Sequence, residues 1–476
     1  MSESPGLPGP AGLTALPGYE PMGDAVRPDT ERWPGLDAAG WDRLAALRDH
    51  PHAPRWTHAC GDLLTDDDRI ALQEWAARLS DHESDRRPEP PDWLLAELDR
   101  LRHVVPLLRR LGVRGWEDVP LLSRADLVRA VADLVPVDVP LDRVVQGTSS
   151  GSTGSALVIP WHPVDIAKDL PLLEHLLRRE GVDWRPDVDR MGLLSVVDQE
   201  QAFTYASLLT TRGDQTMARV SLHPSAWGGA DPRADRAAFL AAARPQVVTG
   251  SALSLLALAA VVGADLSGSA DRRLRPLAVV SGAVELSGPA RDELSRVLGC
   301  PVLDLYGLRE VGPVAVATSA DGGHRLVPRR THVEIVDAAG RPVPDGTPGE
   351  VVVSSVENPY LPLLRYRTGD RAALVGTGAD RRLVGLEGRE AVLFTAGSGR
   401  RVQSVELTQQ MQRHGVLAWA VGQSADGGVT ARCVGGDADA AGRALATLLD
   451  QPVTATALTG IRDLGPGKPR RFTSEA

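Results

Sequence analysis

Short runs of continuous apolar residues alternate with helical patterns from about residue 93 to residue 385, and this alternation constrains the fold more than any other feature. Four of these runs are LLSVV (193–197), PQVVTG (245–250), LAVVSG (277–282) and PVLDLYG (301–307), each followed by a helical or glycine-containing turn. Continuous apolar strands that alternate with helices are typical of a buried, largely parallel sheet. The pattern therefore predicts an α/β fold.

Changes in composition along the chain divide it into three parts. Residues 1–92 combine a Pro/Gly-rich start, expected to be disordered or loosely docked, with a mostly helical extension. In this extension, Thr65 or a neighbouring Asp is expected to cap a helix whose apolar residues are Ile70, Leu72, Trp75 and Leu79, and WLLAELDRLRHVVPLLRRLG predicts another. Residues 93–387 form the main domain, in which THVEIVDAAGRPVPDGTPGEVVVSS predicts a hairpin within a small β-barrel-like subdomain. Residues 388–476 mix strand and helix patterns and predict a small, compact α+β unit.

Length and charge exclude several classes of protein. A chain of 476 residues exceeds what one hydrophobic core usually supports, so two or three domains are expected. The net charge of −10 argues against a nucleic-acid partner, because such proteins depend on a basic surface. The apolar stretch 247–266 is interrupted by polar residues and glycines, so it predicts a buried helix rather than a membrane span.

Cysteine usage and the N-terminus bear on the compartment. The widely spaced Cys60, Cys300 and Cys433 predict neither a disulfide framework nor a zinc site. The first residues contain no basic region followed by an apolar core, the pattern of a signal peptide. We therefore expect a cytoplasmic protein.

The first motif is a loop of glycines and hydroxyl side chains, Ser149-Ser150-Gly151-Ser152-Thr153-Gly154. Glycines let the backbone approach a ligand and direct N–H groups toward phosphate oxygens. The loop lacks the spacing of a Walker loop, and by itself the motif is also compatible with a flexible surface loop.

The second motif, LDLYGLREVGP (303–313), is a strand that ends in Tyr306-Gly307 and is followed by Glu310. Ligands of open α/β sheets bind at the carboxyl ends of the strands, where an aromatic ring can stack on a base and a carboxylate can hold magnesium. A buried tyrosine and a solvated glutamate are the alternative for this segment alone.

The third motif is PLLRYRTGDRAAL (362–374), in which Asp370 follows a Thr-Gly turn. Its carboxylate is suited to accept hydrogen bonds from the two hydroxyls of a ribose. In isolation, an aspartate that caps a turn is the alternative.

Lysine is rare in this chain: of 52 basic residues only Lys168 and Lys468 are lysine. A lysine that persists against such a bias indicates a position where a compact point charge is needed rather than the broad fork of arginine. The segment HPVDIAKDLPLLEHLL predicts that Lys168 lies on the surface of a helix. Lys468 lies in the segment GPGKPRRF near the C-terminus.

Taken together and in order, these motifs resemble the adenylate-forming superfamily of acyl- and aryl-CoA synthetases, most closely its phenylacetate–CoA ligase branch. The resemblance extends from about residue 93 to the C-terminus. It is carried by HVVPLLRRLGV, VPLLSRADL, SSGSTG, VVSGAVELSG, YGLREVGP, GEVVVSS with PLLRYRTGD, EGRE and GPGKPRRF. It implies a large N-terminal adenylate-forming domain and a small C-terminal lid domain that carries the catalytic lysine.

The resemblance also implies roles for individual residues. The loop 149–154 would hold the β- and γ-phosphates of ATP, and Glu310 would bind Mg²⁺. Asp370 would bind the ribose hydroxyls, Arg389 the ribose or phosphate side, and Lys468 would bridge the substrate carboxylate and the α-phosphate. The adenine pocket would comprise Ser281, Gly282, Ala283, Glu285, Asp304 and Tyr306. The acid would lie among Tyr205, Gly282, Ala283 and Tyr306.

Two positions depart from the family pattern. Ser155 stands where the phosphate loop of the family usually has lysine. The family's hinge usually has one or two aspartates after Gly-Arg, whereas this chain has Gly388-Arg389-Glu390-Ala391-Val392. The motifs therefore support the adenylation step more strongly than the transfer of the acyl group to CoA.

The resemblance implies ATP-dependent adenylation of a small, aromatic carboxylic acid, followed by transfer to CoA. One alternative keeps adenylation but passes the acyl group to a carrier protein, an amine or another nucleophile. A second alternative is a non-enzymatic protein that binds a nucleotide or a partner. By comparison with related ligases, a homodimer is expected.

Overall fold

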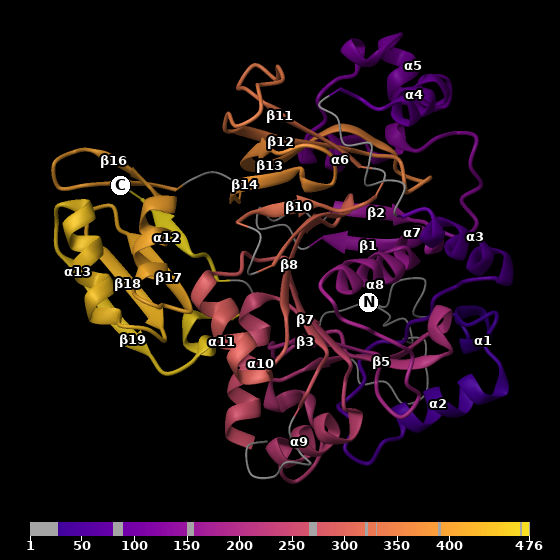
Figure 1. Cartoon of the computed structure of the whole chain (residues 1–476), viewed down its shortest axis with the longest axis horizontal. Helices are drawn as coiled ribbons and strands as arrows, with labels where there is room; N and C mark the ends of the chain where they lie inside the picture. The colour runs from indigo at the N-terminus through magenta and orange to yellow at the C-terminus, as the bar shows by residue number, and fades with distance from the viewer. Residues whose placement is uncertain are drawn as a thin grey trace, which may run out of the picture.

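The computed structural model describes residues 27–79, 89–149, 157–265, 274–318, 322–329, 331–388, 392–466 and 469–475 (Figure 1). Most of the Pro/Gly-rich start, residues 1–26, lies outside this set. The rest of that start is better ordered than predicted, because α1 (Asp29–Arg32) is helical and the Trp33 indole is buried. Burial of a large indole accounts for this order.

The main body is built on a large mixed sheet. Within the described residues the sheet has twelve strands in the order β11-β12-β13-β14-β10-β9-β8-β7-β6-β3-β5-β4. Its parallel part consists of β8 (Val302–Leu308), β7 (Ala278–Gly282), β6 (Val247–Gly250), β3 (Leu193–Val197) and β5 (Gln215–Ser221). All four predicted apolar runs form strands of this part, which confirms that they indicate buried parallel strands.

The remaining strands of the sheet pair antiparallel. They are β4 (Tyr205–Leu209), β9 (Gly312–Ala317), β10 (His324–Leu326), β11 (Thr331–Val336), β12 (Gly349–Ser355), β13 (Leu363–Val375) and β14 (Arg382–Glu387). The predicted hairpin is formed by β11 and β12. The strands of the predicted β-barrel-like subdomain do not form a separate sheet. Instead, β14, β10 and β9 join them to β8 in one continuous sheet. A separate apolar core nevertheless lies here, with Leu122, Ile159, Val314, Val353 and Leu383 among its members.

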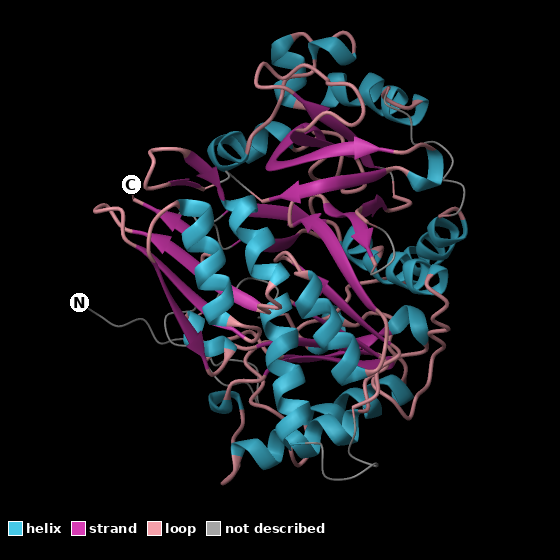
Figure 2. Cartoon of the chain, turned by 60° about the vertical axis from the view of Figure 1, so that its left-hand side comes forward, coloured by secondary structure: helices cyan, strands magenta, loops and turns pink. Residues whose placement is uncertain are grey.

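Helices cover both faces of the parallel strands (Figure 2). One face packs against α9 (Pro232–Ala243), α10 (Ala252–Asp265) and α11 (Gly288–Leu298), and the other packs against α8 (Asp169–Arg179), which follows α7 (Pro163–Ala167). The apolar stretch predicted as one buried helix is β6 followed by α10. No helix among the described residues is long and apolar enough to span a membrane.

The N-terminal extension is helical and is anchored to the main body. Its helices are α2 (Ala38–Arg48), α3 (Asp66–Ala77) and α4 (Asp92–Val104), and α5 (Pro106–Leu111) and α6 (Arg124–Ala130) follow. Thr65 caps α3 and forms a capping box with Asp68, as the sequence suggested, but Ile70 is 55% exposed and does not belong to the buried stripe. The second predicted helix is divided into α4 and α5 at Pro106, because proline lacks the N–H that would continue the first helix.

Short 3-10 turns connect several of these elements. They are η3 (Trp116–Asp118), η4 (Val131–Leu134), η5 (Thr210–Arg212), η6 (Pro224–Ala226), η8 (Gly378–Asp380) and η9 (Ile461–Leu464).

The extension also covers the outer edge of the sheet at β4. The Thr57 and His58 amides donate to the Thr204 carbonyl oxygen, each at 3.0 Å, and the Thr204 amide donates to Thr57 Oγ1 at 2.9 Å. The Trp33 and Trp56 rings are buried in the core of the main body. These contacts hold the extension beside the start of β4, the outermost strand of the sheet.

The C-terminal part of the chain forms an α+β unit that lies beside α11 (Figure 1). Its strands and helices are β15 (Leu393–Thr395), β16 (Arg401–Gln403), α12 (Ser404–Arg413), β17 (Ala418–Gln423), β18 (Val429–Val434), α13 (Ala438–Leu449), β19 (Val453–Leu458) and β20 (Phe472–Ser474). The sheet order is β19-β18-β17-β20, and a core of its own includes Phe394, Trp419 and Leu445. The unit therefore has the core expected of a separate domain.

His332 on β11 is a buried group that should make stability depend on pH. Its ring centroid lies 5.8 Å from that of Trp116, and its Nε2 has no hydrogen-bond partner among the described residues. Burial, reinforced by the charges of Arg381 and Arg365, lowers the pKa of His332 from 6.5 to about 4. The unfolded chain binds this proton at a higher pH than the folded chain, so stability present above pH 6.5 is lost as the pH falls toward 4.

Between pH 7.5 and pH 5 we expect this histidine to lower the free energy of unfolding by about 2 kcal/mol. Urea unfolding of the native protein and of His332→Asn at both pH values measures the effect. The variant should lose about 2 kcal/mol less than the native protein on acidification. An equal loss in both proteins would contradict this origin of the pH dependence.

Candidate active site

The predicted phosphate loop connects two antiparallel strands. β1 (Val145–Ser149) pairs antiparallel with β2 (Leu157–Trp161), and Ser149 lies opposite Leu157 in the last described pair before the connection. The rest of the predicted loop, Ser150 to Gly154, lies outside the described residues. The described strands thus leave residues 150–156 as the connection at one end of a two-stranded ribbon.

Residues from the predicted adenine pocket lie together at the carboxyl ends of two neighbouring parallel strands. Ser281 on β7 lies opposite Asp304 on β8, and Gly282 lies opposite Leu305. The Ser281 side chain is fully buried, and its Oγ has no hydrogen-bond partner among the described residues. Ligands of α/β sheets bind at this edge, and an unsatisfied buried hydroxyl there is consistent with a polar ligand site.

Tyr306 and Asp370, from two separate motifs, are in direct contact. The Tyr306 hydroxyl donates a hydrogen bond of 2.8 Å to Asp370 Oδ2. Asp370 lies within β13 and not after a turn as predicted. Gly369 has a φ of 79°, and the pairing of β12 with β13 shifts in register here, so the Thr-Gly pair forms an irregularity inside the strand. This irregularity turns Asp370 toward the end of β8.

His324 joins the same cluster, and no sequence motif identified it. Its Nε2 lies 3.1 Å from Asp304 Oδ2, and its ring centroid lies 6.5 Å from that of Tyr306 in an edge-on arrangement. His324 is on β10, which pairs with β9 and β14. The histidine thus supports both the aspartate and the aromatic ring of the predicted adenine pocket.

Glu310, the predicted magnesium ligand, lies in the turn between β8 and β9 and is 4% exposed. Arg124 Nη1 lies 2.8 Å from Glu310 Oε1, and the Tyr366 hydroxyl donates to the same oxygen at 3.3 Å. Neither Arg124 nor Tyr366 was singled out from the sequence. The described contacts of Glu310 leave its second carboxylate oxygen, Oε2, unused.

The donor set bears on whether a metal ion fits. Among the described residues there is no group of three or more His, Cys, Asp or Glu side chains that could hold a metal. Magnesium is commonly bound by one or two carboxylates together with phosphates and water. One unengaged oxygen of Glu310 is therefore compatible with a magnesium ion that a nucleotide brings with it.

The segment after β7 and the start of the predicted hinge approach the same cluster. Ala283 has a φ of 66°, a left-handed conformation that is uncommon for a residue with a side chain. Glu285 forms an ion pair with Arg471 of the C-terminal unit at 2.5 Å. A Cβ built on Gly388 would lie 3.9 Å from Asp370 Oδ1, so the hinge begins next to this aspartate. Arg389 and Lys468 lie outside the described residues.

Tyr205, assigned to the acid pocket, lies at the amino end of β4, next to the carboxyl end of β5. In the sheet order, β5, β3, β6 and β7 separate β4 from the strand that carries Tyr306. The centroid of the Tyr205 ring lies 6.3 Å from that of His58 in the N-terminal extension. Burial raises the pKa of the Tyr205 phenol to about 12. The structure thus brings Tyr205 to the carboxyl edge of the sheet but sets it beside the extension.

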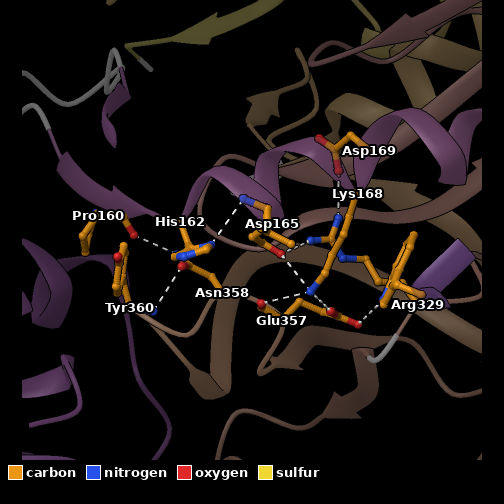
Figure 3. Close-up of polar contacts among 11 residues, drawn as sticks. Pro160, His162, Asp165, Lys168, Asp169, Arg329, Glu357, Asn358 and Tyr360 are labelled. Atoms are coloured by element: carbon orange, nitrogen blue, oxygen red, sulfur yellow. Dashed lines mark hydrogen bonds and ion pairs between the residues drawn. The ribbon is translucent and has the colours of Figure 1, made fainter. Parts of the chain in front are cut away.

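The prediction for Lys168 was wrong, because this lysine is largely buried in a cluster of charges (Figure 3). Its side chain is 12% exposed, and Nζ forms an ion pair with the Glu357 carboxylate and donates to the Glu357 carbonyl oxygen at 3.2 Å. Nζ also lies 3.9 Å from Asp165 Oδ1 and 5.7 Å from the centroid of the Trp75 ring. The compact ammonium of lysine suits such a crowded site.

Arg329 completes this cluster and connects it to the turn that carries Glu310. Its two terminal nitrogens contact Asp165 at 2.7 Å and Asp169 at 2.8 Å, and its side chain is 1% exposed. A Cβ built on Gly312 would lie 2.8 Å from Arg329 Nη1, so the guanidinium packs against the beginning of β9. The buried charges thereby tie α7 and α8 to the β8–β9 turn.

Comparison with known proteins shows which enzymes the chain resembles. Residues 222–358 match the family model described as AMP-binding enzyme. The fold is also that of 2-hydroxyisobutyryl-CoA ligase, solved in a postadenylation state with its acyl-AMP: the TM-score is 0.58 at 17% identity, over 85% of this chain and 90% of that one. By fold, and by sequence over residues 222–358, the chain is therefore similar to adenylate-forming enzymes.

Among curated proteins, the chain is similar to phenylacetate–coenzyme A ligases. It is 28% identical to the Escherichia coli (strain K12) ligase over 284 residues, which are 57% of this chain and 60% of the relative. It is 33% identical to the Pseudomonas putida ligase over 111 residues, which are 22% of this chain and 25% of the relative. In both alignments the chain spans less than two thirds of the length of the relative.

Proposed function

We propose that this protein activates a small carboxylic acid with ATP to form an acyl-AMP and then transfers the acyl group to the thiol of CoA. The observation that carries the proposal is the contact of Tyr306 with Asp370, two residues from separate motifs that meet at the carboxyl edge of the sheet. The family match of residues 222–358 supports the same nucleotide chemistry.

We assign the nucleoside of ATP to the cluster around β7, β8 and β13. The Tyr306 ring would stack on the adenine, with residues 281–285 along its edge, and Asp370 would accept hydrogen bonds from the ribose hydroxyls. The Asp370 carboxylate is held by the Tyr306 hydroxyl, so it is oriented before the ligand binds. An acceptor fixed in advance loses little conformational entropy on binding.

We assign the phosphates to the loop 149–154 and to Glu310. A magnesium ion at Glu310 Oε2 would offset negative charge on the phosphates. The acid's carboxylate oxygen then forms a bond to the α-phosphorus, the bond from that phosphorus to its bridging oxygen breaks, and pyrophosphate leaves. Lys468 would lie between the carboxylate and the α-phosphate and stabilise the charge that develops there.

The second step is a thioester transfer. The sulfur of the thiol forms a bond to the acyl carbon and loses its proton, and AMP leaves with the electrons of the broken acyl–oxygen bond. An aromatic acid is the substrate class we favour, since the curated relatives are phenylacetate–coenzyme A ligases.

A screen of acid-dependent ATP–pyrophosphate exchange over aromatic and aliphatic acids tests the function. We expect exchange to require both an acid and Mg²⁺, and thiol to be consumed when CoA is added. If only a carrier protein bearing phosphopantetheine accepts the acyl group, the acceptor in this proposal is wrong. If no acid supports exchange, the adenylation function itself is contradicted.

A further inference from the structure

The C-terminal unit is attached to the main body on both sides of residues 467–468. On one side, the guanidinium of Arg462 forms a two-pronged contact with Asp198, at 2.9 and 2.7 Å. On the other side, Arg471 Nη1 contacts Glu285 Oε2 at 2.5 Å, and its Nη2 donates to the Glu285 carbonyl oxygen at 2.8 Å. Two anchored arginines therefore flank the segment that contains the only lysine of the tail.

Arg471 is held firmly by its own domain. Its guanidinium carbon lies 4.7 Å from the centroid of the Trp419 ring, and its carbonyl oxygen accepts a hydrogen bond of 2.7 Å from the Val421 amide. Phe472, the next residue, begins β20 and pairs with β17. A planar guanidinium stacked on an indole is well suited to a directed, two-pronged contact.

The partner of Arg471 lies in the segment to which we assign the adenine. Glu285 is two residues after Ala283, whose left-handed backbone costs about 1 kcal/mol or more for a residue with a side chain. Arg471 binds both the side chain and the backbone of Glu285, so it constrains this strained segment directly.

The carboxylate of Glu387 adds negative charge near Glu285, the partner of Arg471. Burial raises the pKa of Glu387, the Arg371 charge opposes this shift, and the Glu285 charge adds to it. The carboxylates of Glu285 and Glu387 therefore interact at the start of the hinge. Arg471 supplies the positive charge that compensates one of them.

We propose that Arg471 is a positioning residue. By binding Glu285, it fixes the position of the lysine-bearing tail segment relative to the adenine-binding segment 281–285. This inference rests on the proposed adenylation function. Docking of the C-terminal unit and ordering of the nucleotide site are then one event, because the same guanidinium belongs to both.

Charge reversal tests the proposal, with Arg471→Glu, Glu285→Arg and the double variant. We expect each single variant to raise the KM for ATP in acid-dependent exchange about tenfold and to increase hydrogen–deuterium exchange of residues 281–287. The double variant should return both values to within about threefold of the native protein, since the pair is restored with opposite polarity. Arg470→Glu changes the charge of the adjacent residue, for which no described ion pair exists, and should leave both values near those of the native protein.

The two readouts separate the possible failures. An unchanged KM in Arg471→Glu, or no recovery of amide protection in the double variant, would overturn the role of Arg471. Hydrogen–deuterium exchange needs no catalysis, so it still reports on the contact between Arg471 and Glu285 if no acid supports the reaction. In that case the adenylation function fails, and a recovered protection pattern shows that the contact itself persists.

Discussion

Replacing Lys468 with alanine is expected to lower acid-dependent ATP–pyrophosphate exchange by about a hundred- to a thousandfold, the usual effect of removing a group that stabilises charge in the transition state. Lys468 is one of only two lysines among 52 basic residues, in a chain that uses arginine almost everywhere else. Arg462 and Arg471 anchor the tail to the main body on both sides of it.

One further variant and one stability measurement make the Lys468 result interpretable. Lys468→Arg keeps the charge but broadens it into a planar fork, and it should recover only a small part of the activity. Thermal unfolding should show that Lys468→Ala is as stable as the native protein, because the substitution removes a charged side chain and leaves every apolar core residue unchanged. Near-native exchange in Lys468→Ala would show that another group activates the acid.

The second large effect concerns stability: Arg329→Met is expected to lower the free energy of unfolding by about 3–5 kcal/mol. Arg329 and Asp165 are each 1% exposed and lie 2.7 Å apart, so the variant leaves a buried carboxylate without its closest cation. Urea unfolding followed by tryptophan fluorescence at pH 8 measures the loss.

The same variant has a predictable pH dependence. Burial raises the pKa of Asp165 to about 6 even with Arg329 and Lys168 nearby. Because this pKa lies above that of the unfolded chain, protonation favours the folded state. The cost of Arg329→Met should therefore be smaller at pH 5 than at pH 8.

Arg341→Met is the matched control, since it removes an arginine whose ion pair is exposed. Arg341 lies 2.8 Å from Asp337, and its side chain is 78% exposed. A surface pair of this kind contributes about 0–1 kcal/mol. Similar losses in Arg329→Met and Arg341→Met would show that the buried cluster does not stabilise the fold.

The parts of the fold that follow local rules were predictable from the sequence. β3, β6, β7 and β8 form where continuous apolar runs occur, because a strand covered on both faces needs apolar residues throughout. The helix cap at Thr65 follows from the hydrogen bonds that its side chain offers to the first turn.

Features that depend on distant partners were not predictable. Lys168 has the local pattern of a helix surface, but its partner Glu357 lies 189 residues further along the chain. Asp370 has the local pattern of a turn, yet the pairing of β12 with β13 makes the same residues an irregularity within a strand. The sequence pattern of Thr-Gly-Asp is common to both situations.

The residues of the candidate site also fall into two groups, those predicted from the sequence and those found only in the structure. Tyr306, Asp370 and Glu310 stand in motifs that the family resemblance brings out. Arg124 lies in the segment VPLLSRADL, to which the resemblance gave no role, and His324 lies in no quoted segment. The part of each residue in the site was revealed only by its contact with an acidic side chain. A single arginine or histidine has no periodic or spacing signal, so its role depends on the tertiary structure alone.

The most direct test of the account is a crystal structure of the protein with an acid substrate and a nonhydrolysable ATP analogue. We predict the adenine beside Tyr306, the ribose hydroxyls within hydrogen-bond distance of Asp370, and Lys468 Nζ between the acid carboxylate and the α-phosphate. A nucleotide bound elsewhere, or bound here with Lys468 remote from the α-phosphate, would contradict the central claim.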